Sequence, residues 1–286
     1  MNGTVRGSQR SFMILSVVVF TALGSLFGCT STQPISRVSL GASHHRDWLP
    51  SVAVLPWAET ENNTVTVRNI RDFRYMDAGT YVPHYYDRTF DVDDLETIDF
   101  IVVPFKQAPD LAHTMLSFGF TDQQYLAVSV EARLEKDETY SPAKGIVNQY
   151  ELMYVVADER DVIPLRTKHR EDDVYVYRVR TDPQLTRQMF RDVMLRVNDL
   201  YRHPEYYNTL TNNCTTNIRE HVNRLRPGRI PFDWRVLLPG HSDRLAYDLG
   251  FLDSSLTFEQ TKQQANVTEI ANAHLNAADF SAIIRR

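Results

Sequence analysis

Residues 112–133 read AHTMLSFGFTDQQYLAVSVEAR, and the expected fold follows from this segment. Apolar residues alternate with small or polar ones on both sides of TDQQ, which is the pattern of two strands that each bury one face. The polar residues between the two runs are typical of a turn. We therefore expect an antiparallel hairpin, with strands at residues 113–120 and 125–131 around a turn at residues 121–123.

The register of this hairpin follows from joining its two apolar faces in one core. That condition pairs Phe118 with Leu126 and places His113 opposite Glu131. The other face of the hairpin then carries His113, Ser117, Ser129 and Glu131. A carboxylate beside an imidazole fixes its tautomer and supports its charged form, so Glu131 is a candidate to orient His113 as a catalytic base. Ser129 takes this role if the register is shifted by one pair, and a polar face in contact with solvent is the other interpretation.

Strand-like runs continue on both sides of the hairpin, and helices dominate the chain after residue 180. The further runs rich in β-branched and aromatic residues are 52–55, 64–67, 81–90, 98–103, 149–156 and 174–179. A first helix is expected after Asp182-Pro183, where a capping side chain precedes a proline and apolar residues then recur at helical spacing. A second helix opens at Asn212-Asn213-Cys214 and ends before Pro227-Gly228. These elements predict the α+β class, with an antiparallel sheet and a packed helix that carries the cysteine.

The N-terminal residues 1–28 have the three parts of an export signal. Two arginines form a positive start, residues 11–27 are uncharged and mostly apolar, and Leu26-Phe27-Gly28-Cys29 resembles the lipobox of bacterial lipoproteins. We therefore expect cleavage before Cys29 and a lipid anchor on the periplasmic side of a bacterial membrane, with Thr30 resembling the outer-membrane sorting pattern. The alternative is an uncleaved membrane anchor, although the run is short for a spanning helix, which needs about 20 residues.

The rest of the chain divides into a lipidated tether at residues 29–48, a periplasmic domain at 49–250 and a helical extension at 251–286. The formal net charge is −5 and no basic stripe offsets it, which argues against nucleic acid as a partner. Walker, Rossmann and zinc patterns are not found, and the acidic runs lack the oxygen spacing of a calcium loop, so we expect neither a cofactor nor a metal. The expected partner is the lipid bilayer, through Cys29, and the sequence specifies no protein partner.

Cys214 is one of two cysteines, so with Cys29 lipidated it has no partner for a disulfide. It lies in the first turn of its expected helix, where free backbone N–H groups and aligned peptide dipoles stabilise a thiolate or an oxyanion. Asn212 and Asn213 are candidates for shaping the oxyanion site or capping the helix. A nucleophilic cysteine needs a base, normally a histidine, and His113 is the candidate with an expected carboxylate beside it. The alternative is that Cys214 is a small apolar residue packed under the helix.

Five segments resemble the periplasmic domain of the bacterial lipoprotein intramolecular transacylases, a broad family long labelled as of unknown function. They are residues 112–120, 125–133, Tyr140-Ser141-Pro142, Asp158-Glu159-Arg160-Asp161 and 207–218, and the last contains the most specific motif, Asn-Asn-Cys-Thr-Thr-Asn. The chain order, with a histidine on an early strand and a cysteine opening a late helix, is also similar to circularly permuted papain-like enzymes, a group that includes lecithin–retinol acyltransferase. The resemblance covers about residues 50–250 and implies this fold, with Cys214 as acyl-accepting nucleophile and His113 as its base. The transacylases carry membrane-spanning helices after this domain, whereas here a lipid anchor is expected, so the resemblance implies the chemistry more directly than the substrate.

The sequence therefore predicts a thiol enzyme that attacks a lipid or lipoprotein ester, holds the acyl group as a thioester on Cys214 and passes it to an amine or to water. Two other functions stay open. One is a cysteine peptidase or amidase that acts on peptidoglycan, and the other is a non-catalytic outer-membrane lipoprotein in which the fold serves for binding. A long apolar groove beside Cys214 favours acyl transfer, whereas a polar, open groove favours peptide cleavage.

Overall fold

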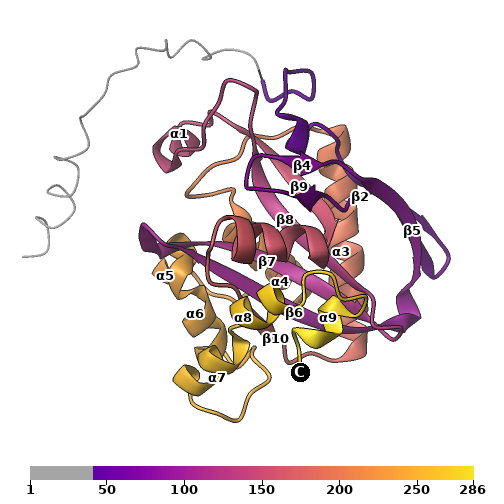
Figure 1. The fold of residues 1–286 in the computed structure, drawn as a ribbon, viewed down its shortest axis with the longest axis vertical. Helices are drawn as coiled ribbons and strands as arrows, with labels where there is room; N and C mark the ends of the chain where they lie inside the picture. The colour runs from indigo at the N-terminus through magenta and orange to yellow at the C-terminus, as the bar shows by residue number, and fades with distance from the viewer. Residues whose placement is uncertain (1–40) are drawn as a thin grey trace, which may run out of the picture. The chain divides into compact units, whose positions relative to one another are not determined.

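A mainly antiparallel sheet runs through residues 41–286, the part of the chain that the computed structural model describes (Figure 1). Its strands follow the order β1-β2-β9-β8-β7-β6-β10, with β5 also paired to β2, and β2 and β9 are parallel neighbours. The strands are β1 (Trp57–Glu61), β2 (Thr64–Arg71), β5 (Tyr85–Asp91), β6 (Leu95–Phe105), β7 (Ala108–Phe120), β8 (Tyr125–Arg133), β9 (Glu151–Asp158) and β10 (Tyr175–Arg178), beside a small separate pair, β3 (Arg74–Tyr75) and β4 (Tyr81–Val82). The predicted export signal and Cys29 lie outside the described residues.

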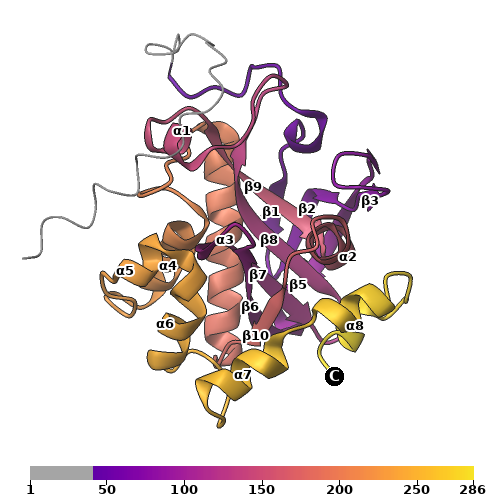
Figure 2. The ribbon, with the colours of Figure 1, turned by 60° about the vertical axis from the view of Figure 1, so that its left-hand side comes forward.

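Two long helices, α3 (Pro183–Arg202) and α4 (Cys214–Leu225), cover one face of the sheet (Figure 2). Helix α3 begins where the sequence predicts, because the Asp182 carboxylate accepts a hydrogen bond from the backbone N–H of Leu185 and Pro183 needs no donor there. Its apolar stripe packs on Phe118 and the neighbouring strands in the larger of two hydrophobic cores. The predicted Cys214 helix is thus confirmed as a packed layer on a largely antiparallel sheet, in a mixed α/β chain.

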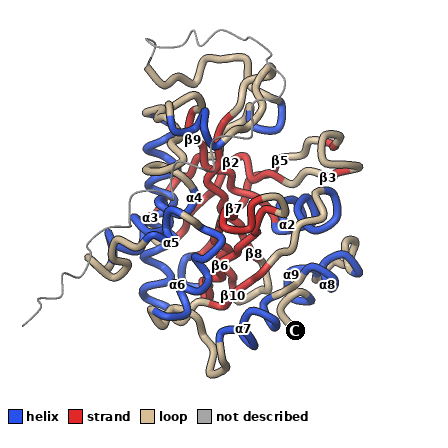
Figure 3. The backbone as a smooth tube through the Cα atoms, turned by 90° about the vertical axis from the view of Figure 1, so that its left-hand side faces the viewer, coloured by secondary structure: helices blue, strands red, loops and turns tan. Residues whose placement is uncertain are grey.

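Helices also cover the second face of the sheet, so the hairpin has no solvent face. Here α2 (Glu159–Pro164), α8 (Thr268–Ala273) and α9 (Phe280–Ile283) enclose a second core that includes Met115 and Ala127 (Figures 2 and 3). The interpretation of this face as polar and solvated is therefore wrong. The remaining helical segments are η1 (Pro50–Val52), η2 (Val92–Asp94), α1 (Pro142–Ile146), η3 (Leu165–His169), α5 (Trp234–Leu237), η4 (Pro239–His241), α6 (Ser242–Asp248) and α7 (Phe258–Ala265).

Both ends of the described chain pack on the domain more closely than the sequence suggested. At the start, Trp48 is buried and the Arg133 guanidinium lies 4.1 Å over its ring, although residue 48 was assigned to the tether. At the other end, Phe280 is buried in the second core, and Arg285 donates to the buried carboxylates of Asp99 and Glu159. The predicted helical extension is therefore an integral layer of the fold.

Strands β7 and β8 pair in the predicted register but separate before their ends. Phe118 faces Leu126, as expected, and the ladder runs as far as Met115 opposite Ser129. Beyond that point β7 continues to pair with β6 down to Ala112, and β8 continues to pair with β9 up to Arg133. The sheet therefore opens between β7 and β8, just where the candidate residues lie. This opening is what allows a side chain from one face to approach a group on the other.

Candidate active site

Cys214 occupies the first position of helix α4, as predicted, and points into the opening between β7 and β8. The Asn213 side chain accepts a hydrogen bond from the Thr216 backbone N–H, and the Thr216 hydroxyl accepts one from the Asn213 backbone N–H, forming a capping box. The Thr215 hydroxyl lies 3.0 Å from that of Thr114 on β7, which ties the start of the helix to the sheet. Since the first N–H groups of a helix have no intrahelical partner, those of Cys214 and Thr215 are the donors next to the sulfur.

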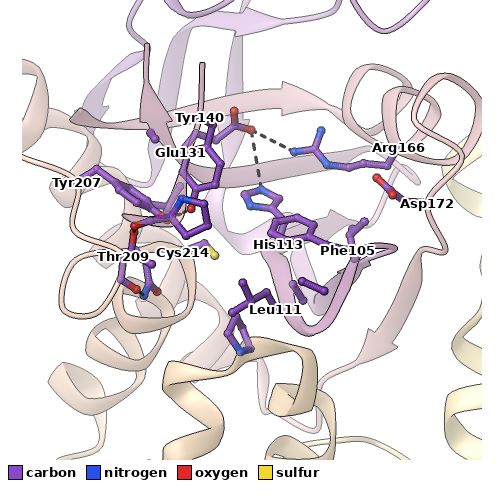
Figure 4. Close-up of a pocket in the computed structure, with 18 of the residues that line it drawn as sticks. Phe105, Leu111, His113, Glu131, Tyr140, Arg166, Asp172, Tyr207, Thr209 and Cys214 are labelled. Carbon is purple, nitrogen blue, oxygen red and sulfur yellow. Dashed lines mark hydrogen bonds and ion pairs between the residues drawn. The ribbon is translucent and has the colours of Figure 1, made fainter. Parts of the chain in front are cut away.

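The Cys214 side chain lines a cavity of about 520 Å³ that receives residues from both faces of the sheet (Figure 4). Ala112, His113, Val130, Glu131 and Ala132 come from the separated parts of β7 and β8. Other parts of the wall are Val103, Phe105, Leu111, Leu134, Tyr140, Pro142, Tyr207, Leu237 and Pro239, with Arg166, Arg170 and Asp172 at one end. The cavity is thus largely apolar around the thiol and charged at the end beyond His113.

His113 and Glu131 are joined through Ser129, which differs from the predicted direct pair. The Ser129 hydroxyl lies 2.6 Å from His113 Nε2 and donates to Glu131 Oε1 over 2.8 Å, whereas Nε2 and Oε1 are 3.9 Å apart. The register is not shifted, so the reason given for Ser129 as a substitute is wrong. The strands separate before His113 and Glu131 come opposite each other, and the serine bridges the gap.

This arrangement assigns the tautomer of the His113 ring. The Ser129 hydroxyl gives its only hydrogen to a carboxylate, so it must accept from His113, which places the ring proton on Nε2. Nδ1 is then the free lone pair and the atom that can take a proton. In residues 41–286 no hydrogen bond joins His113 to the Cys214 sulfur, whose partner is the Thr215 hydroxyl at 3.8 Å. Catalytic hydrogen bonds are often long in a protein without substrate, so this geometry is compatible with a base.

Burial and neighbouring charges keep the imidazole neutral and the carboxylate ionised. Burial, reinforced by the positive charge of Arg166, lowers the pKa of His113 to about 3 although Glu131 opposes the shift. Burial works against ionisation of Glu131, but Arg166 and Arg71, with the hydrogen bond from Ser129, outweigh it and lower the pKa of Glu131 to about 2. At neutral pH the imidazole is therefore uncharged and has a free lone pair, and its low pKa makes it a weak base as long as the charge of Arg166 is not offset.

Two buried arginines, Arg166 and Arg71, stabilise the negative charge of Glu131. Arg166 Nη2 donates to Glu131 Oε1 over 3.4 Å, and Arg71 forms a two-bonded pair with Asp161 at 2.8 and 2.9 Å. The Asp161 carboxylate also accepts from the Phe73 backbone N–H. The charges of residues 158–161 and 166–170 indicate ion pairs near the site or in a stabilised loop. Their partners cannot be identified from the sequence, because Arg71 lies 90 residues from Asp161 and Glu131 lies 35 residues from Arg166.

These residues fall within a segment that matches a known family. Residues 81–240, more than half of the chain, match the model of the Lnb N-terminal periplasmic domain. The chain belongs to this family. The Lnb N-terminal segment contains His113, Ser129, Glu131, Arg166 and Cys214, and its periplasmic character agrees with the location expected from the sequence. The comparisons with curated proteins and with solved structures found no match.

Within this Lnb N-terminal segment the two asparagines before the cysteine have structural roles. The Asn213 side chain caps α4 and donates to the Thr209 carbonyl. The Asn212 side chain donates to the Tyr206 carbonyl and accepts from Asn217. Both side-chain amides are thus engaged with the loop before α4 or with the helix itself, so of the two predicted roles the structure supports capping for Asn213.

Another buried histidine of the matched segment, His221, is engaged elsewhere. Its Nδ1 lies 2.6 Å from Asp192 on α3, and its Nε2 lies 2.9 Å from the Tyr154 hydroxyl on β9. His221 thus joins α4 to α3 and the sheet, and it does not line the cavity that contains Cys214. Across residues 41–286 there is no cluster of histidine, cysteine and carboxylate side chains fit to hold a metal, nor a helix long and apolar enough to cross a bilayer.

Proposed function

We propose that this chain is a membrane-anchored periplasmic thiol acyltransferase. The observation that carries the proposal is a neutral His113, held by Ser129 and Glu131, that opens on the same cavity as the Cys214 thiol at a helix N-terminus. A nucleophile, a positioned base and unpaired backbone donors are the parts that acyl transfer through a covalent intermediate requires.

In the first step an ester enters the cavity with its carbonyl carbon at Cys214. His113 Nδ1 takes the thiol proton as the sulfur attacks the carbonyl, and the backbone N–H groups of Cys214 and Thr215 stabilise the oxyanion. The tetrahedral intermediate collapses, the ester C–O bond breaks, and the leaving alcohol takes the proton from His113. The acyl group then remains on the sulfur as a thioester.

In the second step an amine or water attacks this thioester. Neutral His113 accepts a proton from the attacking group, the C–S bond breaks, and the proton returns to the sulfur. An amine acceptor receives the acyl chain as an amide, and water releases a free fatty acid. The Cys214 thiol is regenerated in both cases, so no further reactant is needed.

The lining of the cavity favours an acyl substrate over a peptide. Most of the wall consists of aliphatic and aromatic side chains, with Thr209 and Asn213 as polar residues near Cys214. The charged groups are Glu131 beside His113 and the arginines with Asp172 at the end beyond it. A hydrocarbon chain gains about 25 cal/mol for each Å² of apolar surface it buries, and a peptide would leave its polar backbone facing these side chains. This is the apolar surrounding that distinguishes acyl transfer from a peptidoglycan peptidase. The helix that presents the cysteine to an antiparallel sheet is compatible with a circularly permuted papain-like arrangement.

The predicted anchor agrees with the proposed substrate. Cys29 lies outside the described residues, and we propose that its lipidation tethers the chain to the periplasmic face of a membrane, most simply the outer membrane. Ester-linked lipids and lipoproteins are abundant at such a surface.

Intact-mass analysis of the whole chain in detergent micelles tests the proposal. Incubation with phospholipid should add one acyl chain that hydroxylamine removes, and a diacylated lipopeptide with a free amine should then discharge it. Cys214→Ala and His113→Ala should abolish the adduct, whereas His274→Ala, an exposed histidine outside the cavity, should leave it unchanged. A cleaved muropeptide without any adduct, resistance of Cys214 to iodoacetamide, or an adduct that persists in Cys214→Ala would contradict the proposal.

A further inference from the structure

The charged end of the cavity holds two arginines whose hydrogen-bonding capacity is not used. Arg166 is almost fully buried, and while its Nη2 donates to Glu131, its Nη1 has no hydrogen-bond partner. Arg170 is exposed at the same end, and among residues 41–286 no carboxylate lies within ion-pair distance of its guanidinium. A buried donor without a partner is costly, so such a group in a native cavity calls for an explanation.

Two acidic groups share this end of the cavity with the arginines. Glu131 is committed to Ser129 and Arg166, as described above. Asp172 lines the same end; burial raises the pKa of its carboxyl, whereas the charges of Arg170 and Arg166 oppose this shift. The nearby Lys106 pairs with Glu171 outside the cavity lining, at 3.6 Å. Within the described residues the Arg170 guanidinium forms an ion pair with neither of these carboxylates, so it is the group at this end that can take up an anion.

We propose that Arg166 and Arg170 form a subsite for the phosphate group of a glycerophospholipid, which thereby serves as acyl donor. This inference rests on the proposed function and names its substrate class. Guanidinium groups bind phosphate oxygens through paired hydrogen bonds, and the exposed Arg170 is the side chain free to close on a ligand. Arg166 contributes a fixed charge behind it.

The order of groups along the cavity matches the order of groups in such a lipid. Figure 4 shows His113 between Cys214 on one side and Arg166 with Asp172 on the other. A donor with its phosphate at the arginines places the glycerol beside the imidazole, the ester carbonyl at the thiol, and the acyl chain against the apolar wall. The leaving alcohol of the first step is then the glycerol oxygen, next to the proton that His113 has taken.

A bound phosphate also acts on the base. Arg166 and Arg170 both contribute to lowering the pKa of His113. An anion that offsets their charges makes the imidazole a stronger proton acceptor while the donor is in place. Donor binding and proton abstraction are thereby coupled through the same two side chains.

A pair of donors that differ only in the phosphate headgroup tests the subsite. The rate of thioester formation by the whole chain in micelles is measured with dioleoylphosphatidylglycerol and with dioleoylglycerol. Arg170→Gln should lower kcat/KM for the phospholipid by about ten- to a hundredfold, and it should not lower kcat/KM for the neutral donor, because the loss of this charge only makes His113 a stronger base. Arg170→Lys should recover part of the loss. Lys168→Gln is the matched control, because this exposed side chain belongs to the same segment and does not line the cavity.

The outcomes separate the two proposals. No thioester with either donor in the unmodified chain contradicts the acyltransferase itself. A thioester that forms equally fast with both donors, or an equal loss with both in Arg170→Gln, overturns the phosphate subsite alone. Calorimetry on the Cys214→Ala variant measures ligand binding without reaction. Short-chain phosphatidylglycerol should bind, and inorganic phosphate at the same concentration should not. Equal binding of the two would assign the site to free phosphate and overturn its assignment to a lipid.

Discussion

Replacing Arg285 by methionine should destabilise the fold strongly although the residue is far from the cavity lining. Its guanidinium donates to Asp99 over 2.8 Å and to Glu159 over 2.9 Å, and it lies 3.7 Å over the Tyr125 ring. Asp99 keeps a second arginine, Arg178, at 2.6 Å. The fully buried Glu159 keeps neutral partners, the hydroxyls of Ser117 and Ser281.

Removing one partner of a buried ion pair costs about 3–5 kcal/mol, because the other charge stays buried and uncompensated. With a urea m-value of about 3 kcal/mol/M, this corresponds to a midpoint lower by about 1–2 M. Burial opposes ionisation of Glu159, but Arg285 outweighs it and lowers the pKa of that carboxyl. The stabilisation is therefore present above the unfolded pKa of about 4.3 and is lost as pH falls through the folded value. In the variant only the two hydroxyls oppose the effect of burial, which raises that pKa, so the stability deficit of the variant should shrink between pH 7 and about pH 4.

Urea unfolding followed by circular dichroism at pH 7 and at lower pH measures both effects. Arg286→Met is the matched control, since Arg286 is exposed and pairs with Asp279 at the surface, and it should change stability by less than about 0.5 kcal/mol. Adding Glu159→Gln to Arg285→Met should restore part of the loss, because a buried amide is less costly than a buried charge. A deficit below about 1 kcal/mol, or one that does not change with pH, would refute this reasoning.

Three further predictions concern the site and its walls. Ser129→Ala should slow thioester formation by about ten- to a hundredfold, since His113 loses its link to Glu131. An unchanged rate, measured by intact mass, would show that Ser129 does not position His113. Burial lowers the pKa of His113 to about 3, so nitrogen NMR spectra should show a neutral ring from pH 8 to pH 5. The free energy of unfolding should decline as pH falls below about 6.5, because the imidazole of the unfolded chain then takes up a proton. A His113 ring that titrates near pH 6.5 would contradict this prediction. Gly240→Ala should cost about 1–3 kcal/mol in urea unfolding, because its Cβ would overlap the Pro109 carbonyl, and an unaltered midpoint would show that this contact relaxes freely.

Local pattern was sufficient to predict the hairpin and the cysteine helix. The pairing of Phe118 with Leu126 followed from the alternation of apolar residues, and the start of α4 followed from the asparagine before Cys214. Both depend on interactions between residues close in sequence, which a single chain displays directly.

Long-range packing decided what the sequence could not show. The covered second face of the hairpin requires helices that follow more than 130 residues later, and their polar composition suggested a loosely attached extension. The placement of Ser129 between His113 and Glu131 depends on where β7 and β8 separate, and no sequence pattern in either strand predicts that point. The charges of residues 166–170 indicate ion pairs near the site or a stabilised loop, but the position of Arg166 and Arg170 beside His113 exists only once η3 is packed.

The separation of β7 from β8 makes the reactivity of this site depend on the fit between two layers. The sulfur is carried by a helix and the imidazole by a strand, so their spacing is set by how α4 sits on the sheet, through the Thr114–Thr215 hydrogen bond and the apolar seam beneath the helix. A substitution among the apolar residues beneath α4 that lets this helix shift along the sheet alters the spacing between sulfur and imidazole, although His113, Ser129 and Glu131 stay unchanged. Related chains can thus tune the speed of one reaction by repacking a helix, and keep every reacting group as it is.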